Sequence, residues 1–250
     1  MPYAYNQDVR IYYEVEGHGS PLVLHHASAD SGQIWQDLGY CDALKPQYQL
    51  IRLDARGHGA SDKPHQTAAY DLYLRVADVI AVLDTIGIQQ THYFGYSMGG
   101  WIGFGLAKYA PKRIRSLIIG GAHPYAERFD ARRAVMRKGR EVFLKALEKS
   151  FGPTLLTPTL RARLAANDFE ALLAMTQDRS CLADMLATLS MPCLLLVGGA
   201  DPRFKQVQAC AQHIPKATFI SFPGYDHMST LGQRDAVLQQ VTAFLAQAAW

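Results

Sequence analysis

Cysteine is scarce in this sequence, and the four cysteines that occur are far apart. Cys41, Cys181, Cys193 and Cys210 form no C-x-x-C pair and do not cluster with histidine along the chain. Zinc modules and disulfide-stabilised secreted domains both rely on closely spaced cysteines. We therefore expect no metal site, no disulfide framework, and reduced thiols of the kind usual in the cytoplasm.

Long apolar runs and a strong charge imbalance are also missing. No window approaches 18 uninterrupted apolar residues, and the first residues lack a basic segment followed by an apolar one. The sequence therefore predicts neither a membrane span nor a signal peptide. The 25 Lys and Arg residues against 22 Asp and Glu give a net charge of only +3. This small excess does not favour a nucleic-acid partner.

Basic residues concentrate in one place only, at Arg132, Arg133, Arg137, Lys138 and Arg140. Such a cluster either binds an anionic partner or forms the solvated face of a helix. No aromatic or glycine-rich stretch accompanies it, as nucleic-acid-binding modules usually require. We expect a solvated helical face.

Short apolar runs alternate with segments of helical periodicity over much of the chain. Strands are predicted at residues 9–15, 21–25, 48–53, 92–95, 114–119, 193–197 and 217–222. Helices are predicted at residues 76–86, from Met98 to Lys108, and around 237–245. This alternation indicates an α/β fold with a mostly parallel, doubly wound sheet covered on both faces.

The alternation stops between residues 122 and 190, where helical periodicity continues without a convincing strand. Pro153 and Pro158 interrupt this segment. We expect residues 1–121 and 191–250 to form the α/β core and residues 122–190 to form a helical insertion. An insertion of this length usually serves function.

The sequence from Gly95 to Gly99 matches the pattern G-x-S-x-G, with Ser97 at its centre. An apolar strand is predicted before it and a helix after it, which is the context that gives the pattern meaning. Glycine on both sides permits a turn so tight that side chains there would collide with neighbouring strands. The alternative is a glycine-rich connection with an incidental serine. We favour Ser97 as a nucleophile.

A serine nucleophile needs a base, and the base needs a carboxylate to orient it. Asp201 follows the predicted strand at 193–197, and His227 lies in a predicted loop after the last strand. Both positions fall at the ends of strands, on the rim of the sheet where Ser97 also projects. The predicted triad is Ser97, Asp201 and His227, with Asp226 assigned a structural role.

Residues 54–61, Asp-Ala-Arg-Gly-His-Gly-Ala-Ser, resemble the D-x-R-G-H-G-x-S loop of the α/β-hydrolase superfamily. The resemblance covers essentially the whole chain, and this loop is more specific than G-x-S-x-G. It implies that Arg56 and His58 are structural and that residues 122–190 form a cap over the pocket. It also implies that no cofactor is needed.

The superfamily usually has His-Gly where this chain has His25-His26. The resemblance assigns the oxyanion hole to the backbone N–H groups of Ala27 and Met98. The His26 side chain either narrows the pocket, offers a hydrogen bond of its own, or sits in a tilted loop with the same N–H positions. Other residues of the oxyanion loop, a neighbour of Ser97, the residue after the strand at 114–119 and apolar residues of the insertion are further pocket candidates: His26, Ser28, Tyr96, His123, Phe129 and Phe143. Most apolar residues of the insertion should pack within it.

The resemblance implies a serine hydrolase similar to enol-lactonases and to haloperoxidase- or perhydrolase-type esterases. We expect it to cleave a small carboxylic ester or lactone through an acyl-enzyme on Ser97. Hydrolysis of a C–C bond or perhydrolysis on the same triad is an alternative. A second alternative is a small-molecule receptor that keeps the fold with little turnover. The residue pattern does not indicate the number of subunits.

Overall fold

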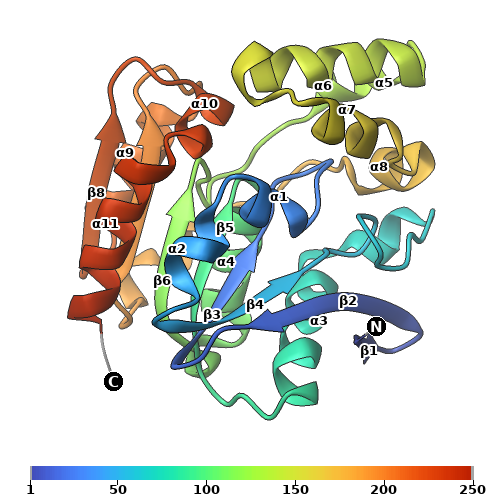
Figure 1. Cartoon of the computed structure of the whole chain (residues 1–250). Helices are drawn as coiled ribbons and strands as arrows, with labels where there is room; N and C mark the ends of the chain where they lie inside the picture. Colours follow the sequence, from blue (N-terminus) through green and yellow to red (C-terminus); the bar gives the residue numbers. More distant parts are fainter. Residues whose placement is uncertain (1, 249–250) are drawn as a thin grey trace.

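Eight strands form one sheet in the order β1-β2-β4-β3-β5-β6-β7-β8 (Figure 1). The computed structural model describes residues 2–248. The pairs β1–β2 and β2–β4 are antiparallel, and the other pairs are parallel. The strands are β1 (Tyr3–Asn6), β2 (Val9–Glu16), β3 (Ser20–His25), β4 (Tyr48–Leu53), β5 (Thr91–Tyr96), β6 (Ile114–Gly120), β7 (Cys193–Gly198) and β8 (Ala217–Phe222). The predicted mostly parallel α/β fold is confirmed.

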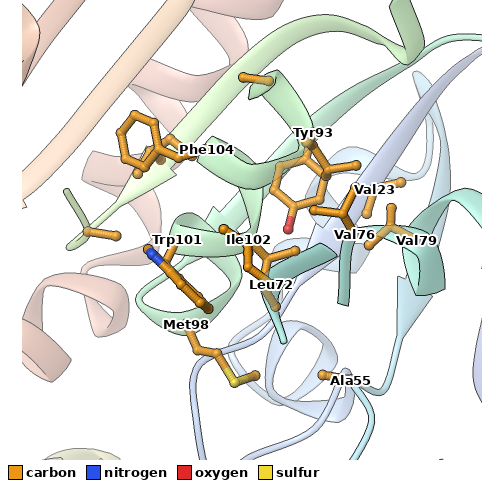
Figure 2. Close-up of a cluster of buried hydrophobic side chains, with 14 of the residues drawn as sticks. Val23, Ala55, Leu72, Val76, Val79, Tyr93, Met98, Trp101, Ile102 and Phe104 are labelled. Atoms are coloured by element: carbon orange, nitrogen blue, oxygen red, sulfur yellow. The ribbon is translucent and has the colours of Figure 1, made fainter. Parts of the chain in front are cut away.

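Helices cover both faces of the sheet because its strands are apolar on both sides. Alternate residues of a strand point to opposite faces, so Val23 packs in one hydrophobic cluster and Leu24 in the other. The first cluster, part of which Figure 2 shows, lies under α3 (Leu72–Thr85), α4 (Met98–Tyr109) and α9 (Phe204–Gln212). The second lies under α1 (Gln33–Asp37), α2 (Tyr40–Leu44), α10 (His227–Gly232) and α11 (Arg234–Gln247).

Between β6 and β7 the chain leaves the sheet and forms helices that lie together above it (Figure 1). These are α5 (Asp130–Met136), α6 (Arg140–Leu155), α7 (Pro158–Ala165) and α8 (Phe169–Met175). Gly152, with φ of +67°, divides α6 into two helical pieces immediately before Pro153. Short 3-10 helices at Thr67–Tyr70, Pro111–Arg113 and Ala183–Thr188 complete the secondary structure.

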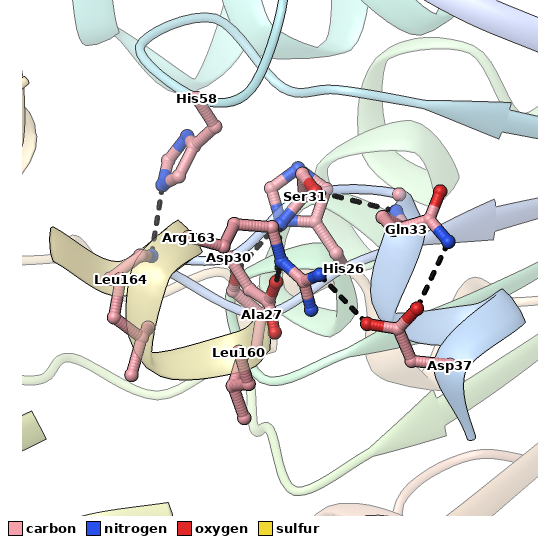
Figure 3. Close-up of polar contacts among 12 residues, drawn as sticks. His26, Ala27, Asp30, Ser31, Gln33, Asp37, His58, Leu160, Arg163 and Leu164 are labelled. Atoms are coloured by element: carbon pink, nitrogen blue, oxygen red, sulfur yellow. Dashed lines mark hydrogen bonds and ion pairs between the residues drawn. The ribbon is translucent and has the colours of Figure 1, made fainter. Parts of the chain in front are cut away.

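Two side chains of the insertion attach it to the loop after β3. Arg163 of α7 pairs with Asp30 through Nε at 2.7 Å and with Asp37 through Nη1 at 2.7 Å (Figure 3). Asn167 Nδ2 donates to the carbonyl of Ala29 at 2.8 Å. These contacts fix the insertion over the end of the sheet where β3 and β5 finish.

Cys41, Cys193 and Cys210 are buried free thiols, and Cys181 is exposed. Burial raises the pKa of the Cys193 thiol to about 12, so this side chain behaves as a small apolar residue. Among the described residues, no helix is both long enough and apolar enough to span a bilayer.

Candidate active site

Ser97 occupies the turn that connects β5 to α4. Its backbone has φ of +54° and ψ of −104°, a conformation that side-chain-bearing residues rarely adopt, and its N–H donates to the Gly120 carbonyl at 2.7 Å. A Cβ at Gly95 would collide with the backbone of Gly99, and a Cβ at Gly99 would collide with the backbone of His25. The two glycines therefore let the strand, the turn and the neighbouring loop approach closely enough to hold Ser97 in this strained conformation.

The structure brings the three predicted triad side chains together. His227 Nε2 lies 2.9 Å from Ser97 Oγ, and His227 Nδ1 lies 2.6 Å from Asp201 Oδ2. Because the carboxylate only accepts, Nδ1 carries the proton and Nε2 is free to accept from the serine hydroxyl. The arrangement can pass a proton from Ser97 to His227.

Asp201 is completely buried, whereas the His227 side chain is 20% exposed. Burial by itself would raise the pKa of Asp201, but the interactions with His227 and with Arg203 together outweigh it and hold that pKa below its usual value. The backbone N–H of Arg203 adds a hydrogen bond to Oδ1 at 2.8 Å. Asp201 is therefore ionised and fixed in orientation.

His227 differs from the prediction in one respect, because it begins helix α10 instead of lying in a loop. Asp226 caps that helix by accepting from the Ser229 N–H at 2.8 Å, and the Ser229 hydroxyl caps in return. The structural role assigned to Asp226 is thus that of the N-cap of α10. A loop was predicted because six residues are too few to show helical periodicity.

Two neighbours that the sequence analysis missed or misplaced hold the His227 imidazole. Tyr96 is buried behind the ring, and its hydroxyl donates to the His227 carbonyl at 2.5 Å. Gly121 has φ of +58°, and a Cβ there would lie 2.8 Å from His227 Cε1. The consecutive glycines at the end of β6 were the available sequence signal for this close approach.

The two backbone N–H groups proposed for the oxyanion hole lie beside each other. Gly99 N–H donates to the His26 carbonyl at 3.1 Å, which joins the residue after Met98 to the residue before Ala27. Within the part of the chain that the structure describes, neither the Ala27 nor the Met98 N–H donates to a protein acceptor. Met98 also begins α4, where the helix dipole favours negative charge.

The His26 side chain points away from the site, so its assignment to the pocket is wrong. The ring is fully buried, its Nε2 accepts from the Ala55 N–H at 3.0 Å, and its Nδ1 donates to the Ala27 carbonyl at 2.7 Å. His58 does the converse, accepting from the Ala29 N–H at 3.0 Å through Nε2. We call this reciprocal pair, His26 with Ala55 and His58 with Ala29, the histidine clasp.

Burial lowers the pKa of both clasp histidines, that of His58 well below its ordinary value. Both imidazoles are therefore neutral near pH 7, as their acceptor role requires. Arg56, the other member of this loop singled out above, forms a bidentate pair with buried Asp78, with Nε to Oδ2 at 2.6 Å and Nη2 to Oδ1 at 2.5 Å. These contacts agree with the structural roles expected of Arg56 and His58.

Comparison with known proteins identifies the family. The model of the α/β hydrolase fold matches residues 20–161. The chain belongs to the α/β-hydrolase family. This membership confirms the family resemblance predicted from the sequence.

This α/β-hydrolase is 26% identical to 3-oxoadipate enol-lactonase 1 of Acinetobacter baylyi over 247 residues, which cover 90% of this chain and 88% of the relative. A hydrolase structure from Pseudomonas aeruginosa superposes with a TM-score of 0.87 at 25% identity, covering 98% of this chain and 97% of the other. The enol-lactonase structure from Burkholderia xenovorans superposes with a TM-score of 0.85 at 23% identity, and the match covers 98% of this chain and 100% of the other. The matches to relatives from Azorhizobium caulinodans and Bacillus subtilis span only 56% and 43% of those proteins.

A cavity of about 380 Å³ opens beside Ser97 and Met98 in this member of the α/β-hydrolase family. Two of the predicted pocket residues, Ser28 and Phe129, line it. Trp101 and Met175 add apolar surface, the former from α4 and the latter from the end of α8. The cavity therefore lies between the core and the insertion.

The other predicted pocket residues do not line this cavity. Tyr96 lies behind His227, as described above. His123 is buried with its ring near Tyr125. Phe143 packs against Phe169 inside the insertion, so it belongs to the insertion's own core. Tyr96 and His123 were assigned from their neighbours in the sequence, which do not show which way a side chain points. Phe143 packs within the insertion, as was expected for most of its apolar residues.

Four arginines line the cavity, and one of them belongs to the cluster for which a solvated helical face was expected. Arg75, Arg132, Arg179 and Arg203 all border it. Arg132 belongs to the basic cluster noted in the sequence, so the prediction of a solvated face was wrong for this residue. No cluster of three or more metal-ligating side chains occurs in the described residues.

Proposed function

We propose that this chain is a serine hydrolase that cleaves a small carboxylic ester or lactone through an acyl-enzyme on Ser97. The single observation that carries the proposal is the hydrogen-bonded series from Asp201 to His227 to Ser97, at 2.6 and 2.9 Å. Side chains from three separate strand ends meet there within proton-transfer distance, beside a cavity that can hold a small molecule.

In the first step His227 Nε2 takes the proton from Ser97 as Oγ attacks the acyl carbonyl. The N–H groups of Ala27 and Met98 stabilise the oxyanion, and loss of one such donor would cost about 3–4 kcal/mol. His227 then returns the proton to the leaving oxygen, and the alcohol or enol departs. Water, deprotonated by His227, attacks the acyl-enzyme and releases the acid with Ser97 restored.

The relatives favour esters and lactones over other acyl substrates, since enol-lactonases occur among both the sequence and the structural matches. Hydrolysis of a C–C bond on the same three side chains differs in the bond that is cleaved. Perhydrolysis differs in that a peroxide, in place of water, attacks the acyl-enzyme. A receptor with little turnover is the alternative outside enzymology, and it predicts a single stalled acylation.

Substitution of Ser97 by Ala should reduce turnover of p-nitrophenyl acetate by at least about 10⁴-fold, because the nucleophile is lost. Release of p-nitrophenol measures the rate, and circular dichroism verifies the fold. Ser150→Ala, on the exposed part of α6, is the matched control and should retain wild-type turnover.

A Ser97→Ala variant that retains wild-type turnover would remove Ser97 from the mechanism. A fluorophosphonate should label the wild type at Ser97 and leave Ser97→Ala unlabelled. Labelling of the wild type together with only one turnover of several generic esters would favour the receptor.

A further inference from the structure

The cavity beside Ser97 has four guanidinium groups in its walls, and three of them already have partners. Arg179 and Arg203 both pair with Glu127: Arg179 Nη1 lies 3.0 Å from Oε2, and Arg203 Nη2 lies 2.5 Å from Oε1. Arg75 donates to the carbonyl groups of Tyr70 and Met175, at 2.9 and 3.2 Å, and its guanidinium stacks on Trp101. These three arginines are held by the protein itself.

The carboxylates in the cavity walls are also occupied. Asp178 pairs with Arg133, which does not line the cavity, at 2.7 Å. Asp71 caps helix α3 by accepting from the Tyr73 N–H at 2.8 Å. Neither acid is directed at the fourth guanidinium, that of Arg132.

Arg132 has no carboxylate partner in residues 2–248. Its Nη2 donates to the Ser28 hydroxyl at 3.1 Å, its guanidinium carbon lies 5.2 Å from the centre of the Phe143 ring, and its buried Nε has no hydrogen-bond partner. Burial and the nearby charge of Arg203 lower the pKa of Arg132 to about 10, which still leaves it charged at neutral pH.

A buried donor on a charged group is costly unless something satisfies it. The stacking on Phe143 and the bond to Ser28 leave the Nε of this planar fork unused. An anion that enters the cavity would pair with the terminal nitrogens of this guanidinium, because Arg132 lines the cavity whereas its Nε is enclosed by protein. A carboxylate suits this role because its two oxygens match two adjacent guanidinium N–H groups.

We propose that the substrate of this hydrolase carries a carboxylate and that Arg132 binds it. This inference rests on the proposed function at Ser97 and specifies its substrate class. Arg132 is bonded to Ser28, the residue after Ala27, so the bound carboxylate lies on the oxyanion side of the cavity, a short chain away from the reacting carbonyl. One unpaired guanidinium matches one negative charge, which favours a carboxylate over a doubly charged phosphate.

The test compares two esters that differ by one charge, mono-4-nitrophenyl glutarate and its neutral methyl ester, after subtraction of spontaneous hydrolysis. Wild type should prefer the charged ester in kcat/KM. Arg132→Gln should lower kcat/KM for the charged ester by about 100-fold and for the neutral ester by less than about 3-fold. Arg132→Lys should recover part of the lost preference for the charged ester, since lysine restores the positive charge but not the two parallel N–H donors of the guanidinium.

Arg137→Gln is the matched control, since it removes the same charge from an exposed position directly after α5. It should leave both rates unchanged. Glutarate should inhibit wild type competitively and inhibit Arg132→Gln far more weakly, while inorganic phosphate should inhibit both poorly.

Two failures are distinguishable. If the neutral ester is hydrolysed but the charged one is no better, and Arg132→Gln changes both rates equally, the carboxylate site does not exist although Ser97 still acts. If neither ester is hydrolysed and Ser97 resists labelling by a neutral fluorophosphonate, the proposed function itself fails. Stronger inhibition by phosphate than by glutarate would also overturn the carboxylate assignment.

Discussion

The two walls of the cavity are held together in different ways. On the core side, the histidine clasp joins the loop after β3 to the loop after β4 through buried backbone groups. On the insertion side, Arg132 reaches the core through a single hydroxyl and keeps an unpaired Nε. The clasp histidines and the N–H groups they accept from are satisfied within the core, whereas the insertion wall leaves a charged group for something else to bind.

This difference suggests a division of labour. Groups that stabilise a transition state must be fixed before substrate arrives, and short buried bonds to backbone fix them well. Groups that select a substrate can be long side chains on a separate layer. Substitutions in the core wall should therefore change kcat for every ester, and substitutions in the insertion wall should change preference among esters.

The largest effect that would sharpen this comparison is expected at Gly121. In Gly121→Ala the new Cβ would lie 2.8 Å from His227 Cε1, and the positive φ adds backbone strain. The imidazole must shift, and a displacement of about 1 Å can cost about 100-fold in rate. We expect kcat to fall by that order for charged and neutral esters alike.

Initial rates on both esters measure this effect, with circular dichroism to verify the fold. Gly139→Ala is a suitable control for the strain, because Gly139 also has positive φ but its Cβ would meet nothing within 4 Å. An unchanged kcat in Gly121→Ala would show that the position of His227 is not set by this contact.

A smaller effect, on stability, is expected from the histidine clasp. His26→Ala leaves the Ala55 N–H without its acceptor, and His58→Ala does the same to Ala29. Each should lower the free energy of unfolding by about 1–3 kcal/mol. The two rings lie 5.0 Å apart and join the same loops, so the double variant should lose less than the sum.

Urea unfolding of wild type, both single variants and the double variant gives the coupling energy. Strictly additive losses would mean that the two bonds act independently. The core wall would then be held, like the insertion wall, by contacts that do not reinforce one another.

The smallest effect concerns acid. Histidine has an ordinary pKa of about 6.5, and the folded-state pKa values of His26 and His58 are lower because of burial. As the pH falls below about 6.5, the unfolded chain therefore binds protons that the folded chain does not. The free energy of unfolding should decrease with falling pH.

His58→Gln keeps an acceptor for the Ala29 N–H and removes one titrating group. Its stability should vary less steeply with pH, by up to about 1.4 kcal/mol per pH unit. Urea unfolding between pH 5 and pH 8 measures the two slopes. Equal slopes would mean that His58 titrates alike in the folded and unfolded chains.

Much of the fold was accessible from the sequence because each parallel strand is a short apolar run. Strand β8 was predicted with its observed bounds, and β7 was predicted to within one residue. Strand β1 and helices α1, α2 and α10 were missed, because segments of four to six residues carry too little periodicity to be recognised. Their positions depend on contacts with distant residues, such as the pairing of β1 with β2.

The sequence by itself determined the α/β layer order and the positions of Ser97, Asp201 and His227 at strand ends, because periodicity and glycine spacing are local properties. Only the tertiary structure decided that His26 turns toward Ala55, that Gly121 borders the imidazole of His227, and that Arg132 faces the cavity. These facts depend on which residues, distant in the chain, come to lie within a few ångströms, and no local pattern encodes the direction of a single side chain.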